Sequence, residues 1–203
     1  MDIQSFGAGY CVVNNCFNNE QLQNLWADIE YIENNNLLAE PSRTGTAIDP
    51  ATGDILKNNK AVFLDKLFHE NKIKHILPTI SKLFSIEIAK SLATIHPCYS
   101  LFENLNVSHS LLSYYETEHH YRSHTDNSVF TFLTWIYREP KSWSGGELIL
   151  TESNTTIEAK NNRTLIIPGS FSHEVLPVKL HTDQPNMGRY CISTFGYIKP
   201  TQG

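Results

Sequence analysis

The pattern of apolar and polar positions changes character near residue 95. Before that point, apolar residues recur at helical spacing over 18–35 and 66–89, which predicts helices, with an interruption expected at Pro78. A short strand is expected over 9–13. Between the helices, residues 41–60 lose this periodicity and carry Thr-Gly and Asp-Pro turn signals, so a long loop is predicted there.

After residue 95, short runs rich in β-branched and aromatic residues follow one another, separated by turn signals such as Ser144-Gly145-Gly146. Strands at this spacing are typical of a sandwich or a jelly-roll barrel. Helices followed by strands predict an α+β fold, with the helices packed on one face of a sheet. The expected strands are 111–115, 129–136, 147–151, 164–167, 172–178 and 190–198.

The composition fits one domain. The chain has 203 residues, of which 40% are hydrophobic and 11% aromatic, enough for one sizeable core. We therefore expect a single domain over 1–203, with supporting helices over about 1–95 and the strand-rich core over about 96–200. The four cysteines are expected to be reduced, buried thiols, because Cys11 and Cys16 are spaced neither as a zinc knuckle nor as a redox pair.

Charge and hydropathy exclude several kinds of partner. The formal net charge is -5 and there is no dense run of Lys and Arg, so no nucleic-acid partner is expected. No stretch approaches the roughly 18 apolar residues of a membrane span. The first residues, MDIQSFGAGYCVV, lack the pattern of a secretory signal. A cytoplasmic protein without a membrane partner is expected, and its oligomeric state stays open.

The stretch HYRSHTDNSVFTF contains a histidine and a carboxylate two positions apart, His124 and Asp126. Residues i and i+2 of an extended chain point to the same side, so both can face one ion. A third ligand is available in His173, at the start of a predicted strand. Two histidines and one carboxylate form the facial triad of non-haem Fe(II) oxygenases. Taken singly, His-x-Asp is more typical of a polar turn, and His173 of a strand-edge histidine; His119 and His120 are expected to be solvated.

Arg189 lies in the last apolar strand, where an unpaired charge is costly. Its planar fork suits the distal carboxylate of a 2-oxo acid, although a structural ion pair is the simpler interpretation of this residue alone. Ser193 falls on the same face, about 13 Å away along the strand. A functional site is favoured because four features follow one another along the chain: His-x-Asp, a Gly-Gly hairpin, a strand that begins with histidine, and Arg-x-x-x-Ser.

Four blocks in this order, LLSYYETEHHYRSHTD, SWSGGELIL, RTLIIPGSFSHEVLPV and RYCISTFGYI, resemble the Fe(II)/2-oxoglutarate-dependent dioxygenases, in particular the prolyl 4-hydroxylase-like branch. The resemblance covers about 111–198. It implies a double-stranded β-helix (jelly-roll) core with supporting N-terminal helices. It also implies Fe(II), 2-oxoglutarate and O2 as cofactor and co-substrates, with ascorbate as a candidate reductant.

The same resemblance implies roles for individual residues. The metal ligands would be His124, Asp126 and His173, and Arg189 would anchor 2-oxoglutarate with Ser193 nearer the metal. Tyr115 stands where the family has a tyrosine that helps to hold 2-oxoglutarate, although Tyr114 could take that role. Tyr121 matches an aromatic residue that lines the site. Trp135 stands where several relatives have a tyrosine contacting 2-oxoglutarate, which leaves Thr134 and Trp135 open as contacts.

The implied reaction is hydroxylation of an unactivated C–H bond, in a prolyl or other amino-acid side chain of a peptide or protein. A free amino acid or a small natural-product intermediate is the alternative substrate. Two other classes use similar residues, a non-catalytic metal-binding jelly-roll sensor and a Zn(II) hydrolase. We hypothesise that the loop over 41–60 closes over the substrate. The stretch 179–188 is either a surface hairpin or a wall of the substrate site.

Overall fold

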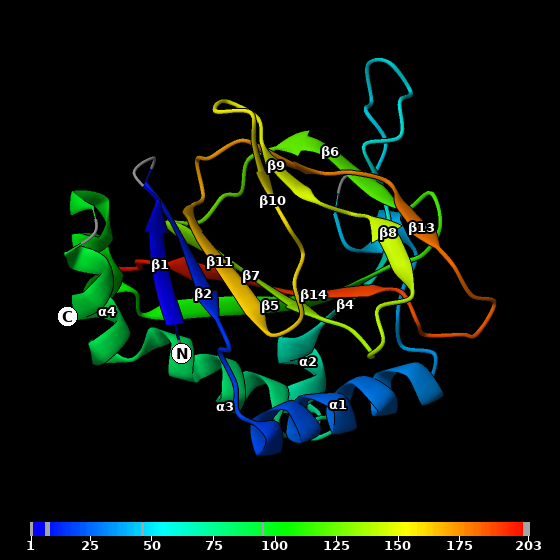
Figure 1. Cartoon of the computed structure of the whole chain (residues 1–203), viewed down its shortest axis with the longest axis horizontal. Coiled ribbons are helices and arrows are strands. Elements are labelled where there is room, and N and C mark those ends of the chain that lie inside the picture. The colour runs from blue at the N-terminus through cyan, green and yellow to red at the C-terminus, as the bar shows by residue number, and fades with distance from the viewer. Residues whose placement is uncertain (1, 7–8, 46, 95, 201–203) are drawn as a thin grey trace.

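The computed structural model of the chain describes residues 2–6, 9–45, 47–94 and 96–200, which form three layers (Figure 1). Helices cover the outer face of a large antiparallel sheet, and a smaller antiparallel sheet packs on its inner face. The expected α+β class is therefore confirmed.

The large sheet has the strand order β1-β2-β11-β7-β14-β5-β4, with β7 at its centre between β11 and β14. The smaller sheet has the order β10-β9-β12-β6-β3, and β13 pairs with β8 beside it. The strands of the large sheet are β1 (Asp2–Phe6), β2 (Tyr10–Asn14), β4 (Lys60–Phe63), β5 (Val107–Tyr115), β7 (Phe130–Ile136), β11 (Arg163–Pro168) and β14 (Arg189–Tyr197). The others are β3 (Lys57–Asn58), β6 (His120–His124), β8 (Trp143–Gly145), β9 (Leu148–Leu150), β10 (Thr155–Ile157), β12 (His173–Val175) and β13 (Val178–Leu180).

The period-two alternation of the large sheet divides the protein interior into two cores. In β7, Phe130 and Phe132 pack towards the helices, whereas Leu133 and Trp135 pack towards the smaller sheet. The other central strands alternate in the same way, so the large sheet separates a helix-side core from an inter-sheet core.

The helices are α1 (Asn19–Asn34), α2 (Leu64–His69), α3 (Ile76–Ile80) and α4 (Ile86–Ala93), with 3-10 turns η1 (Pro41–Arg43), η2 (Ser81–Phe84) and η3 (Pro97–Asn104). α1 begins with a capping box in which Asn18 and Gln21 satisfy each other's backbone N–H groups. The buried carboxylate of Asp28, in α1, accepts hydrogen bonds from three backbone N–H groups at the start of α3, Lys74, His75 and Ile76. No helix in the described ranges is long and apolar enough to cross a membrane.

The element boundaries correct several expectations. Pro78 does not interrupt a helix but lies in the first turn of α3, where its missing N–H needs no partner. The predicted loop over 41–60 contains the short strand β3, and the predicted strand over 172–178 is two strands, β12 and β13. Cys11, Cys16 and Cys191 are buried free thiols, as expected, whereas Cys98 is partly exposed.

Candidate functional site

A cavity of about 130 Å³ lies between the two sheets. That volume exceeds the roughly 10–15 Å³ that one water needs by about tenfold, so a small organic molecule fits. β14 contributes the alternate residues Arg189, Cys191 and Ser193 to the wall, and β5 contributes Ser113 and Tyr115. All of these face the smaller sheet, whose strands supply the opposite wall.

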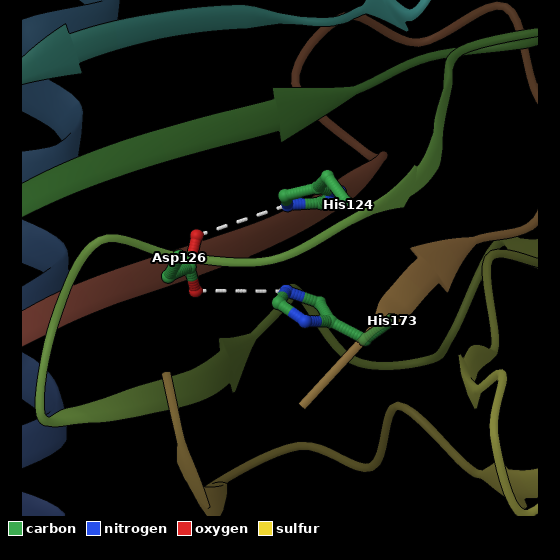
Figure 2. Close-up of side chains that lie close together, drawn as sticks. All are labelled: His124, Asp126 and His173. Atoms are coloured by element: carbon green, nitrogen blue, oxygen red, sulfur yellow. Dashed lines mark ion pairs between the residues drawn. The ribbon is translucent and has the colours of Figure 1, made fainter. Parts of the chain in front are cut away.

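His124, Asp126 and His173 converge on one point of this wall (Figure 2). One ligand atom from each lies within 4.8 Å of the others. Nε2 of His124 is 3.8 Å from Oδ1 of Asp126, and Nε2 of His173 is 3.6 Å from Oδ2. His124 and His173 are direct cross-strand partners on β6 and β12, and Asp126 follows two residues after β6. The three predicted ligands are therefore brought together.

Backbone carbonyls orient both imidazoles. Nδ1 of His124 lies 2.8 Å from the carbonyl oxygen of Arg122, and Nδ1 of His173 lies 2.9 Å from that of Phe171. A carbonyl can only accept, so Nδ1 carries the proton in each ring and Nε2 presents its lone pair towards Asp126. A second hydrogen bond of this kind is typical of metal-binding histidines.

Asp126 is held from two sides. Thr131 Oγ1 donates to its Oδ2 at 2.7 Å, and its backbone N–H donates to the carbonyl of Gly169 at 2.8 Å. A Cβ at Gly169 would lie 2.1 Å from the carbonyl oxygen of Ser128 and 2.9 Å from that of Asp126. Glycine at 169 is thus required for the β11–β12 turn to approach the backbone of Asp126 and Ser128.

The electrostatics of the triad suit a cation. Burial, followed by the proximity of His173, lowers the pKa of His124 to about 4, so its ring is neutral at neutral pH. Asp126 supplies the one negative charge. Two imidazole nitrogens and one carboxylate oxygen on one side of a site leave the other side of an ion open, as in non-haem iron centres.

Arg189 is the largest charged group in the cavity wall and is only 1% exposed. Its Nε and Nη1 have no hydrogen-bond partner among the described residues. The guanidinium lies over the ring of Tyr115 at 4.7 Å and near that of Trp135 at 5.8 Å. Gly146 lies against its side chain, where an added Cβ would be 3.0 Å from Cδ of Arg189. A buried cation without a carboxylate partner is costly, so the cavity is suited to an anionic ligand.

The remaining predicted residues divide by the face they occupy. Tyr115, Tyr121 and Ser193 line the cavity. Tyr114 points to the helix-side core, where its hydroxyl accepts from the N–H of Gly188, so Tyr115 is the tyrosine on the cavity side. The ring of Tyr121 stacks on His124 with a centroid separation of 3.6 Å. Burial raises the pKa of Tyr115 to about 12, which keeps its hydroxyl neutral.

Trp135 and Thr134 are also separated. Trp135 is fully buried on the inter-sheet side near Arg189, and its Nε1 has no acceptor among the described residues. Thr134 faces the helices, where its hydroxyl bonds that of Thr164 at 2.8 Å. Trp135 is thus the residue nearer the cavity, and Thr134 is excluded from it. His119 and His120 are both partly buried, and each imidazole Nδ1 contacts a backbone group, so neither is simply solvated.

Sequence patterns missed the part of the wall that comes from the first half of the chain. Thr44, Lys57 and Asn59 line the cavity because β3 joins the smaller sheet beside β6, pairing Lys57 with Tyr121. Residues 57–60 are all polar and β3 has two residues, so no alternation in the sequence marks which side chains face the cavity. The stretch 179–188 lines no part of this cavity, which agrees with a surface position.

Comparisons with known proteins agree with this geometry. The profile of the 2OG-Fe(II) oxygenase superfamily matches residues 110–197. A PKHD-type hydroxylase of Crocosphaera subtropica (strain ATCC 51142 / BH68) is 36% identical over 86 residues, a match that covers 36% of this chain and 39% of that protein.

Solved structures share the fold across nearly the whole chain. A prolyl-4-hydroxylase of Pseudomonas putida superposes with a TM-score of 0.66 at 13% identity, covering 94% of this chain and 93% of that one. A Trichoplax adhaerens prolyl hydroxylase, solved with a hypoxia inducible factor peptide fragment, superposes with a TM-score of 0.62 at 14% identity, covering 94% and 84%. The expected double-stranded β-helix is confirmed by the shared fold, and the family resemblance is confirmed over residues 110–197, which are similar to the 2OG-Fe(II) oxygenase superfamily.

Proposed function

We propose that this protein is an Fe(II)- and 2-oxoglutarate-dependent oxygenase that hydroxylates an unactivated C–H bond. The observation that carries the proposal is one cavity that holds both the His124–Asp126–His173 cluster and the unpaired guanidinium of Arg189. A 2-oxo acid with a distal carboxylate is a ligand that would use both. The same single domain of 1–203 would carry the reaction, in a cytoplasmic setting.

The residues present fit the two groups that the superfamily's name implies. The two imidazole Nε2 atoms and the Asp126 carboxylate would hold Fe(II), because their lone pairs face one point. Arg189, with two unpaired donor nitrogens, would bind the far carboxylate of 2-oxoglutarate through a fork of hydrogen bonds. When bound, the metal supplies the chemistry that converts 2-oxoglutarate and O2 to succinate and CO2 while one oxygen atom enters the substrate C–H bond.

Other cavity residues would position the co-substrate and exclude water. The guanidinium of Arg189 lies over the rings of Tyr115 and Trp135, and these contacts would help to orient it. The register of β14 pairs Gly196 with Phe130, close after Asp126, so Ser193 is nearer to the metal ligands than Arg189 is. Tyr121, stacked on His124, would fix that ring and line the cavity beside the metal.

For the substrate, we propose an amino-acid side chain, with prolyl as the first candidate. The support is the kind of relative that the chain resembles, since proteins named prolyl hydroxylases and a PKHD-type hydroxylase share its fold or part of its sequence. The substrate would be a peptide, a protein or a small amino-acid-like molecule.

The decisive experiment incubates the purified protein with Fe(II), 2-oxoglutarate, ascorbate and a panel of peptides and amino acids. Succinate formation that requires Fe(II), together with a mass gain of one oxygen in one panel member, is the expected result. His124→Ala should abolish both signals. Substrate oxidation that proceeds without 2-oxoglutarate would contradict the proposal.

Two other functions can be distinguished from this one by assays on the wild-type protein and one variant. A Zn(II) hydrolase could use the three ligands but has no need of Arg189, so zinc-dependent activity that survives Arg189→Met would favour it. A metal sensor would bind Fe(II) and release no succinate under any condition. The guanidinium of Arg189 lines the same cavity as the ligand cluster and has two nitrogens without partners among the described residues, which argues for the oxygenase over both.

We also propose that the segment 41–60 covers bound substrate. Its base lines the cavity through Thr44 and Lys57, while its tip extends away from the body of the protein (Figure 1, cyan). Ile48 and Ile55 pair there across an isolated bridge and are 56% and 52% exposed, which leaves apolar surface for a ligand. Replacing 48–55 by a short glycine linker should raise the Km of the substrate and leave the Kd of 2-oxoglutarate unchanged; an unchanged Km would contradict this role.

A further inference from the structure

The cavity contains a second buried cation that neither the metal cluster nor the co-substrate anchor uses. Lys57 is 3% exposed and lines the cavity from β3, at the edge of the smaller sheet. Arg189 lies on β14, in the large sheet. The two cations therefore approach the cavity from opposite walls. Each can bind a different anionic group.

The ammonium of Lys57 is only partly satisfied. Its Nζ donates to the carbonyl oxygen and to Oγ1 of Thr44, both at 3.0 Å. An ammonium has three N–H donors, so one remains without an acceptor among the described residues. No carboxylate in the described ranges forms an ion pair with Lys57, and burial lowers the pKa of its amine. A buried ammonium with a free donor is suited to an anionic ligand.

The charges that line the cavity support the same conclusion. Among the described lining residues, the charged side chains besides the histidines are Asp126, Arg189 and Lys57. If Fe(II) and the 2-oxoglutarate dianion are bound, as the proposed function requires, their charges cancel. Arg189 then balances Asp126, and the charge of Lys57 is left over. A carboxylate beside Lys57 would pair this remaining charge.

A neighbouring group indicates what accompanies that negative charge. Asn59 is two residues from Lys57, lines the same cavity and is 1% exposed. Its Oδ1 has no donor among the described residues. A free donor of Lys57 and a free acceptor of Asn59 on one wall are complementary to a carboxylate and an N–H group, the two polar ends of an α-amino acid.

We propose that Lys57 and Asn59 form a subsite for the free carboxylate and the amine of an amino-acid-like substrate. The inference rests on the proposed function and sharpens its substrate class. The oxidised molecule carries its own carboxylate, as a free amino acid does, and is not an internal residue of a neutral peptide. Lys57 binds the carboxylate, Thr44 holds the lysine in place, and Asn59 accepts from the substrate nitrogen.

The position of the subsite is consistent with a substrate that enters from outside. Phe63, which also lines the cavity, is 48% exposed and marks its opening. Lys57 lies 5.7 Å from the ring of Tyr121, and that ring stacks on His124. The ammonium is thus separated from a metal ligand by one aromatic ring, close enough for a small substrate to reach both.

The test uses pairs of probes that differ only at the carboxylate. L-proline and other L-amino acids, each with its carboxamide, are titrated calorimetrically into the protein loaded with Fe(II) and 2-oxoglutarate without O2. At least one amino acid should bind about tenfold more tightly than its amide, because a hydrogen bond to a charged group is lost in the amide. Lys57→Met should remove this difference, and Lys57→Arg should restore part of it. Asn59→Leu should weaken the amino acid and its amide alike.

Lys60→Met is the matched control. Lys60 is three residues further along, but its ammonium pairs with Glu116 at 2.9 Å and does not line the cavity. The acid-over-amide preference should persist in this variant. The preference for acid over amide is measured first in the wild-type protein. That measurement tests the proposal even if Lys57→Met is unstable.

Several results would overturn the subsite. They are equal affinity for acid and amide in the wild type, no binding of any amino acid in the panel, or a preference that survives in Lys57→Met. A loss of 2-oxoglutarate affinity in Lys57→Met equal to the loss in Arg189→Met would assign the lysine to the co-substrate and would also overturn it. In each of these cases Fe(II) and 2-oxoglutarate still bind; if the wild-type protein binds neither, the proposed function itself is wrong.

Discussion

The two faces of β14 both carry buried polar groups, and they differ in how those groups are partnered. On the helix side, Tyr190 donates its hydroxyl to Glu33 of α1, whose other oxygen accepts from Arg138 at 2.9 Å. On the cavity side, Arg189 is buried as completely but leaves two nitrogens without partners in the described ranges. The two side chains are equally buried, but only the one on the helix side has hydrogen-bond partners for its polar atoms within the described residues.

The difference distinguishes structural from ligand-binding polarity. A buried polar group normally has a hydrogen-bond partner, because a buried donor or acceptor without one costs about 1–3 kcal/mol. Arg138 shows the structural case, with two glutamates and the face of Trp26 at 4.4 Å. Arg189 shows the other case, in which the partner must come from a ligand. Substitutions on the helix side should therefore change stability, and substitutions on the cavity side should change binding.

The largest effect is expected from Asp126→Ala. This change removes the one negative ligand of the metal cluster, so Fe(II) affinity should fall by more than the roughly 100-fold that a supporting residue can cost. Calorimetric Fe(II) titration measures the loss, with Asp183→Ala, an exposed carboxylate away from the cavity, as control. Equal Fe(II) binding in the two variants would remove Asp126 from the site.

Arg189→Met should raise the Kd of 2-oxoglutarate about tenfold or more, because a charged hydrogen-bond donor is lost. The midpoint of thermal unfolding should stay the same or rise, since an apolar side chain replaces an unpaired buried charge. Arg138→Met is the matched control on the helix side and should show the reverse, lower stability with unchanged 2-oxoglutarate binding. If both variants behave alike, the contrast between the faces is wrong.

Glu33→Ala should lower the free energy of unfolding by about 2 kcal/mol, because it leaves Tyr190 and Arg138 without their shared acceptor. Denaturant unfolding measures the loss. Glu30→Ala removes the more exposed partner of Arg138 and should cost less than about 1 kcal/mol. The affinities for Fe(II) and 2-oxoglutarate should be the same in both variants as in the wild type.

Thr131→Val should weaken Fe(II) binding by about tenfold, because the hydroxyl that orients Asp126 is lost. Thr134→Val is a close control, three residues along the same strand, with its hydroxyl on the helix side. Metal affinity should be unchanged in Thr134→Val. An equal drop in both would mean that the strand, not the hydroxyl, positions the carboxylate.

The smallest effect concerns pH and the metal-free protein. The folded pKa of His124 is about 4, below the ordinary value of 6.5, so the unfolded chain binds more protons between these values. Stability is therefore fully present above about pH 6.5 and falls as the pH drops towards 4. Thermal unfolding in a chelator at pH 7 and pH 5 measures the slope, which His124→Gln should reduce; an unchanged slope would contradict the assignment.

The strands that could be predicted from the sequence are those with runs of β-branched and aromatic residues. The strands with apolar faces on both sides, such as β7 and β11, were expected within one or two residues. β6, β8 and β10 were missed because they are short and carry polar residues at one face or end. Pro78 was expected to break a helix because sequence periodicity does not say where the first turn begins.

The site was predictable where its residues are local or lie on strongly patterned strands. His124 and Asp126 share one segment, and His173 and Arg189 each begin a strand whose face is set by alternation. Lys57 and Asn59 were not predictable, because their place in the cavity depends on pairing between β3 and β6, which are more than 60 residues apart. The first half of the chain is thus part of the binding wall and not only support.

The direct pairing of His124 with His173 has a mechanical consequence. β6 and β12 are linked at that pair and at Val175–Tyr121, with a register shift between them. An ion held by both histidines and by Asp126 would act as a cross-link across this short ladder. Amide hydrogens of β6 and β12 that exchange by local opening should therefore slow when metal is added, and amides of β5 and β14, joined over nine residue pairs, should slow only as far as global unfolding is suppressed.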